Sequence, residues 1–300
     1  MITLTNVTKK FGDITAVDNL SLKVEAGTIF GLVGPDGAGK TTTIRMITGI
    51  MEQTAGYISL LGSENTESVK DQIGYVPQKF SLYGDLTVME NIRVIGALYG
   101  ANNQRVNELG TEILSFTNLL PFKDRLADNL SGGMKQKLAL AAGLMHQPKA
   151  FFLDEPTTGV DPVSRREFWQ MLYRLNKEGM TIFVSTPYMD EAELCTQVAF
   201  MNEGKLVACD TPEHLKEKYP FRLLELKAEE KQIKQLLARC PIKDINAFGD
   251  HYHLVTTPNA DVQREVEDTL KSAGVNRYDI REISPTLEDI FVHLAGGGEA

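Results

Sequence analysis

Three short segments of this 300-residue chain combine residue types that can hold phosphate groups and move a proton. The first fits the pattern G-x-x-x-x-G-K-[ST] and consists of Gly34-Pro35-Asp36-Gly37-Ala38-Gly39-Lys40-Thr41. In this pattern the glycines let backbone N–H groups surround phosphate oxygens, the lysine reaches the β and γ oxygens, and the hydroxyl binds Mg²⁺. Thr42 follows directly and is included among the predicted nucleotide-binding residues.

The strand and the helix on either side of this loop must orient its backbone N–H groups toward a bound anion. Residues 28–33 form a short apolar run of the buried-strand type, and residues 41–50 are expected to follow as a helix. The N-terminal end of a helix carries the positive end of its dipole, together with free N–H groups, and both favour phosphate. A simple glycine-rich turn does not account for strand, loop and helix in this order.

The second segment is a buried strand, residues 150–154, that ends in two adjacent carboxylates. Asp154 suits an aspartate that holds Mg²⁺, and Glu155 suits a base that activates water. Taken alone the pair is ambiguous, because many buried strands end in an acidic turn. The lysine-containing loop upstream favours the catalytic interpretation.

The third segment precedes an apolar helix and reads Leu130-Ser131-Gly132-Gly133-Met134-Lys135-Gln136. Ser131 suits the N-cap of that helix, and Gly132 and Gly133 leave its N-terminus open to a phosphate. With the other two segments, this motif resembles the nucleotide-binding subunits of ABC transporters. The resemblance implies ATP and Mg²⁺ as ligands, and a second ABC ATPase domain whose γ-phosphate meets this helix end when the two domains close.

The resemblance assigns roles to further residues, most of which also have a simpler explanation. Phe11 would stack on adenine with Val17 as a second contact, although a strand-end aromatic also fits a core. Asp161 would communicate across the dimer, although it also suits an N-cap ahead of Pro162. Gln78 would touch Mg²⁺ and the attacking water.

The predicted catalytic residues are therefore Lys40, Gln78 and Glu155. The predicted metal ligands are Thr41, Gln78 and Asp154.

One landmark of the family is missing. Where its pattern places a histidine that donates to the γ-phosphate, this chain has Pro187, which offers neither a side-chain donor nor a backbone N–H. Because Glu155, the Mg²⁺ ligands and the phosphate loop remain, the sequence predicts a slow or regulatory site rather than a dead one. Asp36 stands where the family usually has asparagine, and we expect its carboxylate to face away from phosphate.

The chain is expected to divide near Pro212 into two domains. Residues 1–215 are predicted to form an α/β ATPase domain of the P-loop, ABC type, with a helical subdomain at about residues 79–145. Residues 221–295 are predicted to form a small α+β accessory domain, and residues 296–300 a linker or tail.

Within the accessory domain the pattern predicts strand, helix, strand, strand, helix, strand, then a terminal helix. The ranges are 221–226, 229–238, 242–248, 252–256, 261–273, 278–283 and 287–294. This order suggests a ferredoxin-like sandwich and resembles the accessory domain of ATPases from bacterial ABC-2 type drug exporters. Cys240, His251 and His253 are expected to be packing or surface residues rather than metal ligands.

Composition excludes several classes of protein. The sequence is 42% hydrophobic and 24% charged, and its formal net charge is −9. No apolar run approaches the ~18 residues that a membrane span needs, and no basic surface suits nucleic acid. We therefore expect a cytoplasmic subunit, peripheral on the inner membrane, whose pore is a separate integral membrane permease.

Residues 78–100 are expected to couple ATP to transport. In the family a cytoplasmic helix of the membrane subunit sits beside this loop, so Phe80, Leu82, Tyr83 and Leu86 would line a groove. The alternative is the start of an ordinary amphipathic helix.

The favoured function is the motor subunit of an exporter. The alternatives are a soluble ABC ATPase acting on chromosomes or ribosomes, and a regulatory module that binds ATP with little turnover. Pro187 beside an intact signature suggests an unequal pair, formed either by a tandem two-ATPase polypeptide or by two different subunits.

Overall fold

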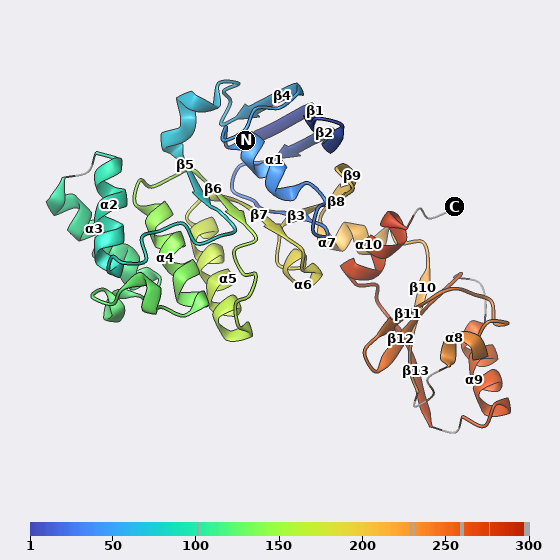
Figure 1. The fold of residues 1–300 in the computed structure, drawn as a ribbon. Helices are drawn as coiled ribbons and strands as arrows, with labels where there is room; N and C mark the ends of the chain where they lie inside the picture. The colour runs from blue at the N-terminus through green and yellow to red at the C-terminus, as the bar shows by residue number, and fades with distance from the viewer. Residues whose placement is uncertain (101, 229, 231, 259–260, 276, 297–300) are drawn as a thin grey trace. The chain divides into compact units, whose positions relative to one another are not determined.

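The computed structural model describes residues 1–100, 102–228, 230, 232–258, 261–275 and 277–296. The chain forms two compact units, Met1–Pro212 and Glu213–Ala300 (Figure 1). Each unit has its own sheet and its own apolar core. Among the described residues, no helix has the length and apolar character to cross a bilayer.

The main sheet of the first unit has six strands: β3 (Ile29–Val33), β5 (Ile73–Val76), β6 (Ala150–Asp154), β7 (Thr181–Thr186), β8 (Gln197–Asn202) and β9 (Lys205–Asp210). Their order is β5-β6-β7-β3-β8-β9, and all run parallel except β9, which is antiparallel to β8. Every residue of β3, β6 and β7 is buried, as expected for parallel strands covered on both faces. The carboxyl ends of these three strands therefore meet at one edge of the sheet.

A second sheet in this unit is antiparallel and lies in the order β2-β1-β4. Its strands are β1 (Ile2–Phe11), β2 (Ile14–Val24) and β4 (Ala55–Leu60). Leu4 of β1, Phe30 of β3, Phe152 of β6 and Ile44 of helix α1 (Lys40–Ile47) belong to one buried cluster. Helix α1 and the two sheets thus share a single core, which holds the start of α1 in place.

The helices α2 (Val88–Leu98), α3 (Asn103–Phe116) and α4 (Gly132–Leu144) pack against one another in a helical subdomain (Figure 1). Helix α5 (Pro162–Lys177) contacts both α4 and β7, and the single turn α6 (Met189–Ala192) follows β7. Three 3₁₀ turns complete the unit: η1 (Thr66–Gln72), η2 (Leu120–Phe122) and η3 (Ala127–Asn129). Helix α7 (Pro212–Glu217) begins at the last residue of the unit.

Asn91 of α2 ties the irregular segment before this helix to the helix itself. Its side chain is fully buried. Its Nδ2 donates to the carbonyl oxygens of Tyr83 (2.9 Å), Leu86 (3.3 Å) and Thr87 (3.0 Å), and its Oδ1 accepts from the Tyr83 backbone N–H (2.9 Å). One side chain therefore substitutes for the hydrogen bonds that a regular element would give this backbone.

The second unit contains a four-stranded antiparallel sheet in the order β11-β12-β10-β13. Along the chain its elements are β10 (Arg222–Ala228), α8 (Ile233–Leu236), β11 (Ile242–Phe248), β12 (His251–Thr256), α9 (Val262–Ser272), β13 (Tyr278–Ile283) and α10 (Leu287–Ala295). Leu224, Leu226 and Leu254 of the strands form a core with Ile233 of α8 and Val266 of α9. The order strand, helix, strand, strand, helix, strand is the one that the sequence predicts for a ferredoxin-like unit.

Differences from the predicted elements are small. The helix predicted over residues 229–238 is a single turn, Ile233–Leu236, and two residues of its predicted first turn, 229 and 231, lie outside the described residues. Of the predicted tail, residues 297–300 also lie outside them, while Gly296 is the C-cap of α10. Helix α1 ends at Ile47, three residues before Ile50, because Gly49 has a φ of +71°.

We expect Asn91→Ala to destabilise the first unit by about 1–3 kcal/mol, because it leaves the backbone N–H of Tyr83 without its partner and removes one hydrogen bond from each of three backbone carbonyl oxygens. Urea unfolding followed by circular dichroism measures the loss. The matched control is Asn107→Ala, which removes an exposed asparagine of α3 that accepts one hydrogen bond from Arg93. Equal stability of the two variants would contradict this role for Asn91.

Candidate nucleotide-binding site

The loop between β3 and α1 has a backbone that requires glycine at several positions. Gly39 is the N-cap of α1 with a φ of +101°, and Gly37 has a φ of +81°. A Cβ on Gly34 would lie 2.1 Å from the carbonyl oxygen of Met201, so this residue must be glycine for the loop to stay against the sheet. The N–H groups of the first turn of α1 have no partner within the helix, and they favour an anion at this end.

Lys40 is buried beside this loop, with a side chain only 3% exposed. Its Nζ donates to the carbonyl oxygens of Gly34 (2.8 Å) and Pro35 (3.0 Å) and lies 3.2 Å from Glu155 Oε1. Asp36, in contrast, is exposed. The site thus combines one buried ammonium group with the free N–H groups of a helix start, which is the donor set that phosphate oxygens accept from.

Asp154 joins three elements of the site. Its Oδ1 accepts hydrogen bonds from Thr41 Oγ1 (2.9 Å) on α1 and from Ser185 Oγ (2.7 Å) on β7. Its Oδ2 is buried without a hydrogen-bond partner. Burial raises the pKa of the Asp154 carboxyl above its usual range, against the hydrogen bonds from Ser185 and Thr41, which lower it.

A hydroxyl and a buried carboxylate with one unpaired oxygen form the oxygen donor set that Mg²⁺ binds beside nucleotide phosphates. The residues present therefore fit a Mg²⁺ ion held by Thr41 and Asp154 with a nucleotide on the loop. Ser185 was not predicted from the sequence.

Glu155 stands at the end of β6 with a left-handed backbone, φ +48°, which is uncommon for a residue other than glycine. Its Oε2 accepts from Gln78 Nε2 (2.8 Å), while its Oε1 faces Lys40. Its backbone N–H donates to the backbone oxygen and to Oγ of Ser185, both at 3.1 Å. The carboxylate is thus held between a cation and an amide donor.

A buried polar network that the sequence did not predict lies next to Pro187. Glu191, only 1% exposed, accepts from Thr157 Oγ1 and from Thr186 Oγ1 (2.6 Å), and Arg165 Nε lies 3.4 Å from Glu191 Oε1. Thr186 Oγ1 also accepts from the backbone N–H of Tyr188 (3.1 Å). These bonds fix the turn that follows β7 on both sides of the proline. No pattern in the sequence indicates that Glu191 is buried.

The predicted adenine contacts differ in their exposure. Phe11 at the end of β1 is 46% exposed, and Lys9 Nζ lies 5.1 Å from the centre of its ring. Val17 is fully buried in the core of the unit. Val17 lies on the inward face of β2, so the second contact to the base stays a prediction that the structure does not test.

The signature segment forms the start of α4. Ser131 is its N-cap and accepts from the Met134 backbone N–H (3.3 Å), and a Cβ on Gly133 would lie 2.5 Å from Cβ of Ser164. Asp161 caps α5 through hydrogen bonds from the N–H groups of residues 163 and 164. Among the described residues, no hydrogen bond or ion pair joins the signature segment to the loop of Lys40.

The structure therefore brings together five predicted residues of the site and leaves two predicted groups outside it. Bonded contacts link Lys40, Thr41, Gln78, Asp154 and Glu155. The signature residues and the cap residue Asp161 lie at the starts of α4 and α5.

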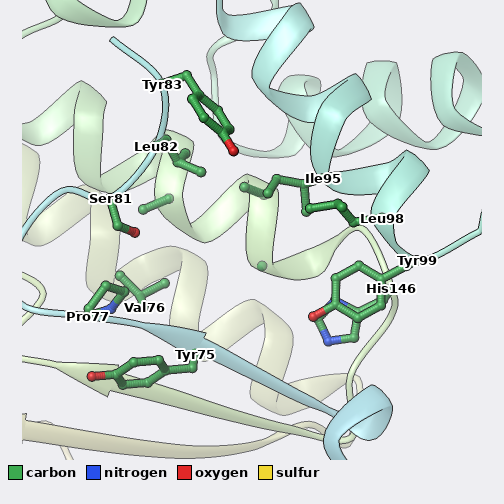
Figure 2. A pocket seen from close by; sticks show the side chains of 13 residues that line it. Tyr75, Val76, Pro77, Ser81, Leu82, Tyr83, Ile95, Leu98, Tyr99 and His146 are labelled. Carbon is green, nitrogen blue, oxygen red and sulfur yellow. The ribbon is translucent and has the colours of Figure 1, made fainter. Parts of the chain in front are cut away.

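Beside the segment that carries Gln78, the structure has a groove between β5 and the helical subdomain (Figure 2). Apolar and aromatic side chains from the loop and from α2 line it, among them Leu82, Tyr83, Ile95 and Leu98, and the ring of Tyr99 stacks on His146 at 4.0 Å. Of the residues predicted to line this groove, Leu82 and Tyr83 do so. Phe80 instead faces Lys135, whose Nζ lies 5.6 Å from the ring centre, and Leu86 is not part of the lining.

Comparison with known proteins shows the family to which this chain is similar. The family model described as ABC transporter matches residues 17–158. A probable multidrug ABC transporter ATP-binding protein, YbhF of Escherichia coli K12, is 40% identical over 306 residues, covering 99% of this chain and 52% of the relative. A daunorubicin resistance ATP-binding protein, DrrA2 of Streptomyces coeruleorubidus, is 33% identical over 298 residues, covering 96% of this chain and 92% of the relative. The chain belongs to the ATP-binding proteins of ABC transporters.

A solved structure supports the same assignment for the first unit. The ATP-binding cassette MJ0796, in a dimeric post-hydrolysis state bound to ADP and Pi, has a TM-score of 0.65 and 26% identity. The match covers 70% of this chain and 98% of that one. The chain spans about half the length of the Escherichia coli relative.

We expect Ser185→Ala to weaken Mg²⁺-dependent nucleotide binding, most strongly at acidic pH. Only the ionised Asp154 binds Mg²⁺, and the Ser185 hydrogen bond favours that form, so its loss raises the pKa further and moves the loss of binding to higher pH. The expected effect is about tenfold to a hundredfold, since a hydrogen bond to an ionised group contributes about 1.5–3 kcal/mol. Titration with a fluorescent ATP analogue from pH 5 to 8 checks this, with the exposed Ser68→Ala as control; an unchanged pH profile would exclude this role.

Proposed function

We propose that this chain is the ATP-binding and hydrolysing motor subunit of an ABC-2 type export system that drives transport through a separate membrane subunit. The observation that carries the proposal is the convergence of Lys40, Asp154 and Glu155 at one edge of the parallel sheet. The names of its relatives, which refer to multidrug transport and daunorubicin resistance, favour export as the process.

The geometry suggests how these residues divide the reaction. Mg²⁺-ATP, when bound, supplies the phosphoryl group that is transferred to water. Glu155 accepts the proton of that water, while Gln78, which already bonds the same carboxylate, positions the water. Lys40 exchanges its contacts with the loop carbonyls for phosphate oxygens and stabilises the charge that develops on them. Thr41 and Asp154 would hold a Mg²⁺ ion, which would neutralise charge on the phosphate oxygens.

A second ABC ATPase domain completes this site in the proposal. Ser131, Gly132 and Gly133 at the start of α4 are directed to the nucleotide of that domain, and Asp161 communicates across the pair. Pro187 beside an intact signature favours a tandem polypeptide or a pair of different subunits. Nucleic acid has no part in this assembly, in agreement with the net charge of −9.

The membrane subunit is proposed to dock in the groove beside Gln78, at the cytoplasmic face of the membrane. Leu82, Ile95 and Leu98 offer apolar surface there, and Tyr83 is 51% exposed. A cytoplasmic helix with an apolar face is the partner that such a groove accommodates.

Pro187 favours a specific alternative, a regulatory module that binds ATP with little turnover. Residues 1–212 contain one histidine, His146, and it is bonded to the carbonyl oxygen of Ile73 (2.8 Å) and stacked on Tyr99. No histidine of this unit is therefore available to donate to the γ-phosphate. Glu155 with its partners nevertheless remains, so we propose slow hydrolysis at this site rather than none.

We expect Pro187→His to increase single-turnover ATP hydrolysis by roughly tenfold or more, because it restores a donor to the γ-phosphate. Glu155→Gln keeps the size of the side chain but replaces the carboxylate by an amide that cannot accept the proton. This variant is expected to abolish turnover while ATP binding persists. Rapid quench of radiolabelled ATP by the purified chain measures both. If Pro187→His leaves the rate unchanged, the missing histidine does not limit this site.

We expect Tyr83→Asp to abolish co-purification with the membrane subunit, because it places a charge in an apolar groove. Ile50→Asp is the matched control, since Ile50 is 56% exposed and lies outside the groove. ATP binding by both variants is expected to equal that of the native chain. Retained co-purification of Tyr83→Asp would argue against docking at this groove.

A further inference from the structure

Two histidines and a glutamate gather on one face of the sheet in the second unit. Glu225 of β10, His251 and His253 of β12 each offer a ligand atom, and these atoms lie within 4.8 Å of one another. Glu225 pairs directly with His253 in the antiparallel register, and His251 is two residues away on the same face of β12. The grouping is therefore set by strand register rather than by mobile loops.

Both imidazole rings are oriented by a second carboxylate. His253 Nδ1 lies 2.8 Å from Asp289 Oδ1 on α10, and His251 Nδ1 lies 3.1 Å from Asp250 Oδ1. Asp289 Oδ2 already accepts from Thr286, so this carboxylate acts as an acceptor and the hydrogen is on Nδ1 of His253. The Nε2 atom of each ring is left as the lone-pair donor, the arrangement found where carboxylates orient metal-binding histidines.

Glu225 keeps one oxygen for a ligand. Its Oε1 accepts from Arg281 Nε (2.8 Å), whereas its Oε2 faces His251 Nε2 at 4.0 Å. The side chains of Glu225 and His251 are 19% and 32% exposed, and that of His253 is 6% exposed. The cluster is thus partly open to solvent on the Glu225 side and closed on the Asp289 side.

We propose that Glu225, His251 and His253 form a binding site for a divalent transition-metal ion, with Zn²⁺ as the ion of this class that the donors fit best. Two imidazole nitrogens and one carboxylate oxygen suit Zn²⁺, while Mg²⁺ and Ca²⁺ prefer oxygen donors. Ligands ~2.1 Å from one zinc ion lie roughly 3.4 Å apart, so modest side-chain rotations bring the three donors into range. A water molecule is the expected fourth ligand.

This site would stabilise the accessory unit rather than act on a substrate. The ion would cross-link β10 to β12, and the bond from His253 to Asp289 would extend this constraint to α10. The assignment differs from the expectation drawn from spacing alone, in which His251 and His253 only pack or lie at the surface. It is independent of ATP, because every residue involved belongs to the second unit.

Calorimetric titration of the full chain with Zn²⁺, without nucleotide, tests the proposal. We expect one ion per chain, bound at least about tenfold more weakly by His251→Gln and by Glu225→Gln, since even outer-shell partners change metal affinity by about 10–100-fold. Zn²⁺ is also expected to raise the unfolding temperature of the native chain but not that of His251→Gln. Arg281→Gln, which removes a competing cation from Glu225, is expected to bind Zn²⁺ more tightly.

Two variants serve as controls. His214→Gln removes an exposed histidine of α7, and Cys240→Ser removes a thiol of the same unit. Both are expected to bind Zn²⁺ as the native chain does, and Co²⁺ is expected to give a visible spectrum typical of nitrogen and oxygen ligands without thiolate. Unchanged binding by His251→Gln and Glu225→Gln, loss of binding in either control, or no stoichiometric binding by the native chain would overturn the site.

Discussion

The hydrogen bonds of the Asp154 carboxylate hold the nucleotide site together. One oxygen of this buried group accepts from Thr41 at the start of α1 and from Ser185 on β7, while Asp154 itself ends β6. Three elements that are distant in the sequence are thereby fixed at one edge of the sheet. Because the second oxygen has no partner and the group is fully buried, the arrangement carries an electrostatic cost that a bound cation would offset.

The ion pair of Lys40 and Glu155 also places charged groups in a buried position. Both side chains are almost fully buried, and such pairs add little net stability because desolvation offsets their attraction. The burial of this ion pair is therefore better explained by a role of the two side chains in the proposed reaction than by a contribution to the stability of the fold. Each group has a further set of partners, the loop carbonyls for Lys40 and Gln78 for Glu155, so each can give up the other without becoming isolated.

Much of the fold was predictable because the sequence patterns that indicate it involve residues close together in the chain. The loop of Lys40 and the strand that ends in Asp154 are recognised from residue types that lie side by side in the chain, and most elements of the second unit follow from periodicity. Ser185 could not be recognised in this way, because it faces Asp154 only through the parallel register of β6 and β7. The burial of Glu191 and of Val17 could not be recognised from the sequence for a related reason, since burial depends on the elements that pack above a residue and not on the residue type.

The bond between Gln78 and Glu155 has a thermodynamic consequence for the groove. Gln78, whose amide bonds the proposed base, lies in the chain between Pro77 and Ser81, which both line the groove, so a change at one place can be transmitted to the other. If a partner binds the groove more tightly when nucleotide is present, nucleotide must bind more tightly, by the same factor, when the partner is present. Coupling of this kind is a reciprocal free energy, and in this chain the hydrogen bond from Gln78 to Glu155 is a direct link through which it can pass.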